Sequence, residues 1–345
     1  MNADRVFRLF ASCIPVKGAR RSTVCDLQRG GYHLIPNGLY EILTAHRDST
    51  LAQVRAAYGN RHDATIDQYY RFLEERELGF WCDDPGEFPD LDLEWDRSEP
   101  VTNAIVDVDA GSDHDFASIV GQLDDLGCRA LQLRVFCEVT PGRLDAILGA
   151  LAGSRLRSLE LMLRHAAWMT DAALGALAAS HRRVTSLFVH SAPAPRTLAT
   201  PSGLEAHFRT ERVDSHTHCG QVHPAYFTVN IATFTEAQRF NTCLNRKISV
   251  DARGDIRNCP SLPASYGNVR DTSLHAALAR EGFRDLWEIN KDQVETCREC
   301  EFRYVCIDCR AFVRAPGDRY SRPSKCTYDP STARWGSPAP EHSHA

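Results

Sequence analysis

An ordered array of seven cysteines in the last third of the chain constrains its fold more than any other feature. The array comprises Cys243 and Cys259, the run Cys297-x2-Cys300-x5-Cys306-x2-Cys309, and a final Cys326. A C-x2-C spacing places two sulfurs on one turn, so both reach the same metal site. Two such pairs five residues apart indicate metal binding. Four thiolates suit a structural Zn²⁺ or an iron–sulfur cluster equally well, and spacing alone does not decide between them.

Length, charge and hydropathy narrow the class of protein. The 345 residues suffice for two or three domains, and a hydrophobic content of 43% is ordinary for a globular protein. The net charge of −5 argues against a protein that binds nucleic acids or anionic membranes in general. The start, MNADRVFRLFASC, lacks the apolar run of a signal peptide, and no stretch approaches the length of a membrane span. We therefore expect a cytoplasmic protein whose thirteen cysteines serve metal or redox chemistry rather than disulfides.

Residues 1–82 are predicted to form a small α+β unit of winged-helix type. STVCDLQRGGYHLIP indicates two strands joined by a turn at Gly30-Gly31, and the apolar spacing in LYEILTAH, LAQVRAAY and TIDQYYRFLEERELGF indicates helices. Residues 83–100 follow as an acidic linker with eight acidic residues, one basic residue and three prolines. This linker is either a solvated connection or a docking strip for a basic partner.

Residues 101–240 alternate strand and helix signals. We expect strands at 102–110, 128–139, 156–163 and 184–190, helices at 116–127, 142–153 and 170–181, and a further strand at 226–234. Such repetition implies right-handed crossovers and a parallel sheet. About four such units form part of an α/β barrel or an open sheet, so the expected fold class is α/β with a partial parallel (βα) barrel-like middle domain. One helix is expected at 273–289, and residues 331–345 are expected to be a disordered tail.

The cysteine pattern resembles the SPASM domain, which lies at the C-terminus of many peptide-modifying radical SAM enzymes and holds auxiliary [4Fe–4S] clusters. The likeness rests on C-x15-C with a G-x4-C inside it, from Gly254 to Cys259, and on the C-x2-C-x5-C-x2-C run before the last cysteine. The usual run ends in C-x3-C, whereas only two residues separate Cys306 from Cys309. The resemblance implies a C-terminal SPASM domain over residues 241–330 that binds two [4Fe–4S] clusters.

The resemblance also implies how the ligands divide between the clusters. Cluster two would be held by Cys297, Cys300, Cys306 and Cys326. Cluster one would be held by Cys243, Cys259 and Cys309, which leaves it one ligand short. Cys219, in the sequence THCGQ, is the candidate for the fourth ligand. The alternatives are an iron open to substrate, or ligation by His216 or His218, which would point the same way on a strand.

The chain lacks the C-x3-C-x2-C triplet with which radical SAM enzymes bind the cluster that cleaves S-adenosylmethionine, so no such cleavage is expected. A SPASM segment without this motif resembles the SPASM-domain peptide maturase of grasp-with-spasm systems. The likeness is carried by STVCDLQRGGYHLIPNGLYEIL, NTCLNRKISVD, GDIRNCPS, YGNVRDTSL, and CRECEFRYVCIDCRAF followed by KCTYDP. It covers most of the chain, more weakly between 80 and 210. It implies two partners, the leader of a ribosomally made precursor peptide and an ATP-grasp ligase.

The N-terminal unit is similar to leader-peptide recognition elements related to the pyrroloquinoline-quinone chaperone. Such elements bind a peptide by adding it as a strand to a sheet edge, next to a helix. The resemblance implies that residues 1–82 hold the leader of the precursor peptide. The alternative is a winged-helix-like fold without a peptide role.

Carboxylates also gather in VDVDAGSDHDF, where His114 lies among Asp107, Asp109, Asp113 and Asp115. Side chains at the carboxyl ends of parallel strands bind ligands in α/β folds. A solvated loop that caps the next helix is nevertheless the expected structure. P-loop and GxGxxG patterns are absent, so ATP chemistry must come from a partner.

Three functions are compatible with these residues. The leading hypothesis is an iron–sulfur maturase component that acts on a precursor peptide together with an ATP-grasp ligase, with no catalytic residue assigned. The alternative is a non-enzymatic adaptor in which the metals only stabilise the fold and the protein presents the peptide to the ligase. The third is a zinc hydrolase, which the absence of HExxH spacing disfavours.

Overall fold

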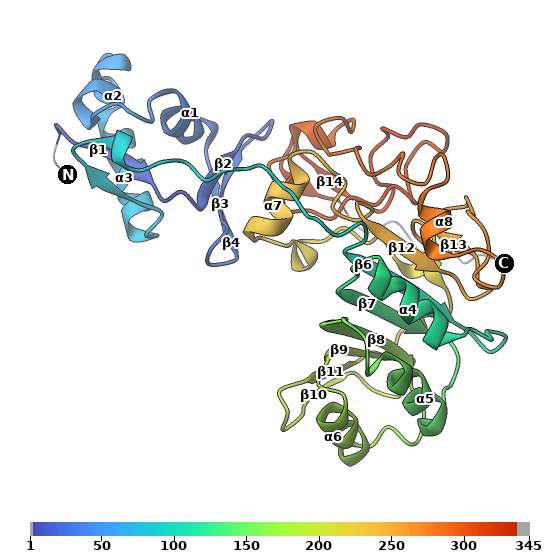
Figure 1. The fold of residues 1–345 in the computed structure, drawn as a ribbon. Helices are drawn as coiled ribbons and strands as arrows, with labels where there is room; N and C mark the ends of the chain where they lie inside the picture. Colours follow the sequence, from blue (N-terminus) through green and yellow to red (C-terminus); the bar gives the residue numbers. More distant parts are fainter. Residues whose placement is uncertain (1–2, 337–345) are drawn as a thin grey trace. The chain divides into compact units, whose positions relative to one another are not determined.

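The computed structural model describes residues 3–336. Its chain divides into two compact units, and each is described by itself. Unit 1 combines the residues up to Trp95 with Gln221–Thr242 and the segment from Ile289 onward, and unit 2 consists of Asp96–Gly220 and Cys243–Glu288. Figure 1 shows the helices and strands with the labels used below. Each unit is therefore assembled from segments that are far apart in the sequence.

Unit 2 is a mixed α/β structure built on one large, mostly parallel sheet. Its strands lie in the order β10-β11-β9-β8-β7-β6-β12-β13, and the edge strands β10 and β13 are antiparallel to their neighbours. The strands are β6 (Asn103–Val108), β7 (Ala130–Val135), β8 (Ser158–Arg164), β9 (Val184–His190), β10 (Arg196–Ala199), β11 (Glu205–Phe208), β12 (Lys247–Val250) and β13 (Ile256–Arg257). In the described part of the chain β10 and β13 do not pair with each other, so the sheet is open rather than closed into a barrel.

The crossover helices of unit 2 begin at side-chain caps that the sequence supplies. They are α4 (Phe116–Asp125), α5 (Pro141–Leu151) and α6 (Asp171–Ser180), and a short α8 (Leu274–Leu278) follows later. Asp115, Thr140 and Thr170 each accept a hydrogen bond from a backbone N–H of the first helical turn. The strands and helices expected between 102 and 190, and their parallel arrangement, are confirmed.

The two faces of this sheet differ in chemistry because side chains alternate along each strand. One face packs against the helices through residues such as Val106, Leu133 and Leu161, which are at most 1% exposed and share a core with α4, α5 and α6. The intervening residues of the same strands, among them Asp107 and Arg134, point to the opposite face. We call this second surface the polar face. The charged side chains of Asp107 and Arg134 lie on this face.

The N-terminal part of unit 1 consists of two small sheets and three helices. The strands are β1 (Val6–Leu9), β2 (Cys13–Val16), β3 (Ser22–Asp26), β4 (Gly31–Ile35) and β5 (Gly79–Cys82), and the helices are α1 (Asn37–Ala45), α2 (Leu51–Ala57) and α3 (Asp63–Glu75). β1 pairs with β5, and β2, β3 and β4 form an antiparallel sheet in that order. The hairpin expected around Gly30-Gly31 is confirmed, whereas the likeness to a winged helix stays a prediction.

The rest of unit 1 contains little regular structure and packs against β3. It contains α7 (Ile231–Ala237), the 3-10 turns η3 (Pro224–Tyr226) and η4 (Cys297–Glu299), and the pair β14 (Tyr328–Asp329) and β15 (Arg334–Trp335). Cys25 of β3 is buried in the same cluster as Phe234, Phe302 and Tyr328. The N-terminal sheet and the cysteine-rich segment therefore share one hydrophobic core within unit 1.

Three expectations about regular structure fail. Residues 226–234 are not a strand, because Asn230 caps the helix α7. The helix expected at 273–289 ends at Leu278, and Gly282 has a left-handed φ of +84° that ends any continuation. Within the tail expected from 331, β15 pairs with β14, while residues 337–345 lie outside the described part of the chain.

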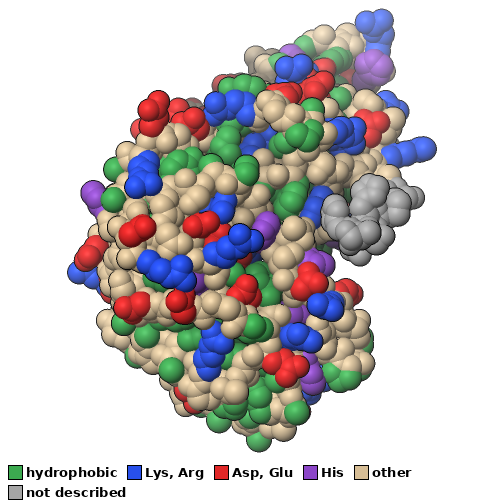
Figure 2. All heavy atoms as spheres, turned by 90° about the vertical axis from the view of Figure 1, so that its right-hand side faces the viewer, with side chains coloured by type: hydrophobic (Ala, Val, Ile, Leu, Met, Phe, Trp, Pro, Cys, Tyr) green, Lys and Arg blue, Asp and Glu red, His purple; other side chains and the backbone are tan. Residues whose placement is uncertain are grey.

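The surface is mixed in charge. Figure 2 shows Lys and Arg interspersed with Asp and Glu over the face in view, in keeping with the small net charge. Among the described residues, no helix combines the length and apolar character that crossing a membrane requires.

Candidate metal centres

Cys297, Cys300, Cys306 and Cys326 all lie in unit 1 and are called the four-cysteine site. Cys297 opens the turn η4, and the N–H of Cys300 donates to the carbonyl of Cys297 at 2.9 Å. The N–H of Cys306 donates to the carbonyl of Phe302, also at 2.9 Å. These hydrogen bonds close two tight turns in the segment that carries Cys297, Cys300 and Cys306.

The four thiols share one electrostatic environment. Burial raises the pKa of Cys297 to about 11, and the charges of Asp308 and Cys326 add to this rise while Lys291 opposes it. Burial likewise raises the pKa of Cys306 to about 12, with contributions from Cys326 and Cys297. The pKa of Cys300 lies well above its ordinary value, first through burial and then through charges that include Cys306 and Cys297. Buried thiols with such pKa values hold their protons until a metal displaces them.

A buried lysine serves this site. Lys291 is 5% exposed, and its Nζ lies 3.7 Å from Oδ1 of Asp308 without a hydrogen-bond partner. Burial lowers the pKa of Lys291, but Asp308 and the thiolates of Cys306 and Cys297 outweigh burial and raise this pKa above its ordinary value. A buried ammonium is costly unless anions compensate it. Its position beside the thiols fits an anionic, thiolate-bound metal group.

Cys219, Cys243 and Cys259 lie in unit 2 and are called the three-cysteine site. Asn258 joins the two loops that bear Cys243 and Cys259, because its Nδ2 donates to the carbonyls of Leu244 at 3.0 Å and Lys247 at 2.7 Å. Cys259 is 6% exposed, and burial raises its pKa to about 11, with smaller contributions from the charges of Cys243 and Cys219.

This second site also has a lysine. The Nζ of Lys247 donates to Sγ of Cys243 at 3.7 Å. Burial lowers the pKa of Lys247, but the thiolates of Cys243, Cys259 and Cys219 outweigh burial and raise it. The structure thus places Cys219 in the same electrostatic environment as Cys243 and Cys259. Its role as the fourth ligand of cluster one stays a prediction.

The other ligand candidates are His216, His218 and Cys309. His216 and His218 are in the 3-10 turn η2 (His216–His218) rather than on a strand, so the expected shared strand face does not exist. His218 lies 3.2 Å from Asp214, whereas the buried Nδ1 of His216 has no hydrogen-bond partner. Cys309 is 6% exposed and belongs to unit 1, and its assignment to cluster one stays a prediction. In the described part of the chain, no group of three or more His, Cys, Asp or Glu side chains is arranged to hold a metal ion.

The polar face of unit 2 holds a buried ion pair close to the three-cysteine site. Nε and Nη2 of Arg134 donate to the two carboxylate oxygens of Asp107 at 2.6 and 2.7 Å, and the side chains are 5% and 2% exposed. Burial lowers the pKa of Arg134, but Asp107 first, and then Cys219 and Cys259, raise it. Asp107 is therefore a buried strand residue, so the expectation of a solvated carboxylate is wrong for it. Asp115, by contrast, caps α4 as expected.

A known protein family matches part of the cysteine array. Residues 242–301 match the SPASM family, an iron–sulfur cluster-binding domain. The match includes Cys243, Cys259, Cys297 and Cys300. The chain therefore carries a SPASM-type iron–sulfur segment, and the choice of iron over zinc, which spacing left open, is supported by this match.

The similarity to solved structures is weak. The crystal structure of Streptococcus suis SuiB bound to S-adenosylmethionine is 10% identical, with a TM-score of 0.33, over 94% of this chain and 99% of that chain. The structure of Streptococcus suis SuiB bound to the precursor peptide SuiA is 9% identical, with a TM-score of 0.32, over the same shares. No curated protein matches this sequence.

Sequence reasoning missed part of both centres. No local pattern in the sequence indicates that Lys291 and Asp308 form a buried pair near the cysteines. Lys247 lies four residues after Cys243, and the structure turns its ammonium to the sulfur. The Asp107–Arg134 pair was missed because its partners come from neighbouring strands.

Proposed function

We propose that this protein is an iron–sulfur maturase component that acts on a ribosomally synthesised precursor peptide, together with an ATP-grasp ligase and without cleavage of S-adenosylmethionine. It would do so in the cytoplasm. Its two auxiliary [4Fe–4S] clusters would be held by the cysteines predicted above. The N-terminal unit would hold the leader of the precursor.

One observation carries this proposal. Two of the cysteines assigned to cluster two, Cys297 and Cys306, raise the pKa of the buried ammonium of Lys291, and this segment overlaps the SPASM match. A [4Fe–4S] cluster on four thiolates is an anion, and a buried cation beside it offsets part of the cost of burying that charge. A purely hydrophobic core would gain nothing from a lysine with no hydrogen-bond partner.

The chain's own residues would have separate roles. When bound, the clusters supply electron transfer or an iron that binds a substrate group. Cys297, Cys300, Cys306 and Cys326 hold one cluster, and Lys291 balances its charge. Lys247 does the same at the three-cysteine site. An extended leader would add to an edge of the sheet β2-β3-β4, which ends in β2 on one side and β4 on the other.

Metal and sulfide analysis of the anaerobically purified protein tests the proposal. We expect about eight irons and eight acid-labile sulfides per chain, with the broad absorption near 400 nm that such clusters show. One or two zincs per chain without sulfide would contradict it. Zinc would instead assign the cysteines to folding alone.

The alternative function is a metal-stabilised adaptor, and two hydrogen bonds favour it. Oγ1 of Thr23 in β3 donates to the carbonyl of Glu301 at 2.9 Å, and the N–H of Ala19 donates to the carbonyl of Glu299 at 2.8 Å. The peptide-binding sheet is thus bonded directly to the turn that bears Cys297 and Cys300. A metal that orders this turn would order the sheet as well.

Substitution of Cys219 or Cys243 in a reconstituted reaction separates the two functions. If the clusters take part in the chemistry, Cys219→Ala and Cys243→Ala lose product while the protein stays folded. If the protein is an adaptor, product is unchanged. Cys137→Ala is the matched control, because Cys137 is a half-buried thiol of unit 2 outside the array.

A further inference from the structure

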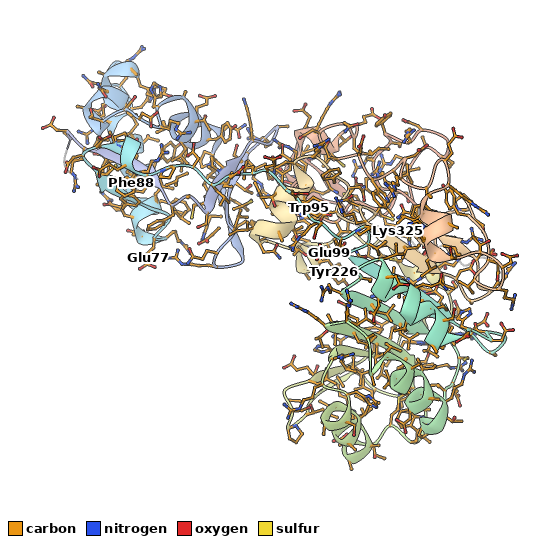
Figure 3. The ribbon with its side chains drawn as sticks, viewed as in Figure 1. Glu77, Phe88, Trp95, Glu99, Tyr226 and Lys325 are labelled. Atoms are coloured by element: carbon orange, nitrogen blue, oxygen red, sulfur yellow. The ribbon has the colours of Figure 1, made fainter. Side chains whose placement is uncertain are left out.

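The middle of the acidic linker is held in place by side-chain contacts rather than left in solvent. Residues 88–95, which we call the strap, run across the N-terminal part of unit 1 and are held there by side chains. The ring of Phe88 lies 4.7 Å from that of Phe80 in β5, and the ring of Trp95 lies 5.4 Å from that of Phe240. Figure 3 shows Phe88 and Trp95 at the two ends of this segment.

Asp90 anchors the middle of the strap to two arginines. Nη2 of Arg8 donates to Oδ1 of Asp90 at 3.0 Å and to the carbonyl of Phe88 at 2.9 Å. Nη2 of Arg47 donates to both oxygens of Asp90, at 2.9 and 2.8 Å. The basic partner for this acidic segment is therefore inside the same chain.

Side chains alternate along the strap as they do along a strand. Leu91, Leu93 and Trp95 are partly buried, and Asp92 and Glu94 between them are exposed. Leu91 and Leu93 pack against the core that contains β3 and the cysteine-rich segment. This period of two, with apolar residues inward and acids outward, is the pattern of an extended peptide laid on a surface.

The strap lies over a groove that it does not fill. A cavity of about 400 Å³ is lined by β1, β2, α1 and Tyr70, and Asp90, Leu91 and Leu93 of the strap form its remaining wall. β1 and β2 are each the edge strand of their sheet. A groove between two sheet edges and a helix is suited to an extended peptide.

We propose that the strap is a tethered competitor for this groove, and that the partner which displaces it is an extended peptide carrying an acidic residue next to alternate leucine-like side chains. The inference rests on the proposed function, because it gives the chemistry of the peptide that the N-terminal unit receives. It assigns Arg8 and Arg47 as the residues that read the acidic position. It also explains why the linker is acidic where it meets the N-terminal unit.

The acidity of the partner follows from the burial of Arg8. The side chain of Arg8 is 9% exposed. It donates to Asp48 at 3.1 Å, to Asp90 and to the carbonyl of Phe88, and only the bond to Asp48 remains when the strap leaves. A nearly buried guanidinium that loses one of its two carboxylate partners is destabilised. An incoming peptide without an acid would leave Arg8 with Asp48 alone, and such a peptide would displace the strap less readily than an acidic one.

Fluorescence anisotropy on the full-length protein tests the proposal. The probe is a labelled peptide with the sequence of residues 86–97, GEFPDLDLEWDR. The host is either the wild type or a strap variant with Asp90→Asn, Leu91→Ser and Leu93→Ser. The apparent Kd varies inversely with the fraction of molecules whose groove is free, and a tethered segment competes at an effective concentration on the order of mM. We therefore expect the strap variant to bind the probe at least tenfold more tightly than the wild type.

Two matched changes test which groups read the peptide. Arg47→Glu in the strap variant should abolish binding, because it reverses the charge that meets Asp90. Arg47 is 42% exposed on its side chain, so this change is compatible with folding. Arg71→Glu, on the exposed surface of α3 outside the groove, should leave the Kd unchanged. A probe with Asn in place of Asp90 should bind at least fivefold more weakly.

Equal affinity of the wild type and the strap variant, or no binding by either while circular dichroism shows folded protein, would overturn the proposal. So would indifference to Arg47→Glu. Iron and sulfide are measured on the same preparations. Their absence would count against the proposed iron–sulfur function and would leave the anisotropy result standing, so the two failures are distinguishable.

Discussion

Arg21, next to the first residue of β3, donates from its Nε to Oε1 of Glu301 at 2.7 Å, and Glu301 directly follows Cys300. Glu301 has no exposed surface, and the hydroxyl of Tyr328 donates to the same carboxylate oxygen. Arg21 in turn donates to the Tyr328 hydroxyl at 3.2 Å. The contact thus couples the N-terminal sheet to the four-cysteine site through a closed network of charge-assisted hydrogen bonds.

Removing Arg21 should weaken both ends of this network. Arg21→Ala leaves the buried carboxylate of Glu301 without its cation, and we expect a loss of about 2–4 kcal/mol in the free energy of unfolding. Arg21 is 30% exposed, so solvent keeps the loss below that of a fully buried pair. Urea unfolding followed by tryptophan fluorescence measures it, and Arg20→Ala, on an exposed neighbour, is the control. Equal midpoints for the two variants would contradict the coupling.

Lys291 should influence the reduction potential of the cluster that we propose for the four-cysteine site. In Lys291→Met the positive charge beside the thiolates is lost, so reduction, which adds negative charge, becomes harder. A unit charge at about 7 Å contributes about 2 kcal/mol at an effective dielectric constant of about 20, which corresponds to a shift of about 100 mV to more negative potential.

Redox titration of the loaded protein, monitored by electron paramagnetic resonance, measures this shift. Lys291→Arg keeps the charge and should keep the potential near that of the wild type. Lys17→Met, on an exposed lysine of the same unit, should change nothing. A potential that is the same in all four proteins would separate Lys291 from the metal site.

The Asp107–Arg134 pair should be costly to break and cheap to replace. Arg134→Met leaves a carboxylate that is 2% exposed without its partner, and we expect a destabilisation of about 3–5 kcal/mol. The double variant Asp107→Leu/Arg134→Met removes both charges and should regain most of this loss. Chemical denaturation provides the measurement, with the exposed Arg157→Met as the control. Additive losses in the double variant would contradict the pairing.

His190 should make unit 2 less stable in mild acid. The side chain is fully buried, Nε2 lies 3.3 Å from the carbonyl of Val135, and the N–H of Val213 donates to Nδ1. This arrangement suits the neutral ring, and burial lowers the pKa of His190 below its ordinary value. The unfolded state then binds a proton that the folded state does not, so stability falls as the pH drops below about 6.5.

Denaturant midpoints measured between pH 7.5 and 5 test this dependence. His190→Gln lacks the titrating ring and should show a shallower fall with pH, although it is less stable throughout. His62→Gln, on an exposed residue of unit 1, should keep the wild-type slope. If His190→Gln kept that slope, another group would be responsible for the acid sensitivity.

The contrast between predicted and missed elements has physical causes. β6 to β9 were predictable because their apolar runs are bounded by the caps Asp115, Thr140 and Thr170, which the sequence displays locally. The run 226–234 was misread because its β-branched and aromatic residues favour a strand, whereas a single cap at Asn230 starts a helix. In that segment one local hydrogen bond outweighs propensity.

The candidate sites divide in the same way. Cysteine spacing is a local signal, so the candidate ligands were visible in the sequence, whereas their division between two clusters follows from the family resemblance and stays a prediction. Lys291 was not, because nothing around it in the sequence shows that tertiary packing buries its ammonium beside Cys297 and Cys306. The strap was half predictable. Its acids were visible, but Arg8 lies 82 residues before Asp90, too far for any sequence pattern to join them.

Unit 1 is built from three separate stretches of the chain, and this has a consequence for its biogenesis. A ribosome delivers β3 long before Phe302 and Tyr328, the residues that complete its core. Until translation is nearly finished, the nascent sheet displays an uncovered apolar face, and such intermediates are prone to aggregate. Production of this protein in folded form should therefore depend on slow synthesis or on chaperones, and truncation before Tyr328 should yield insoluble material rather than a smaller folded protein.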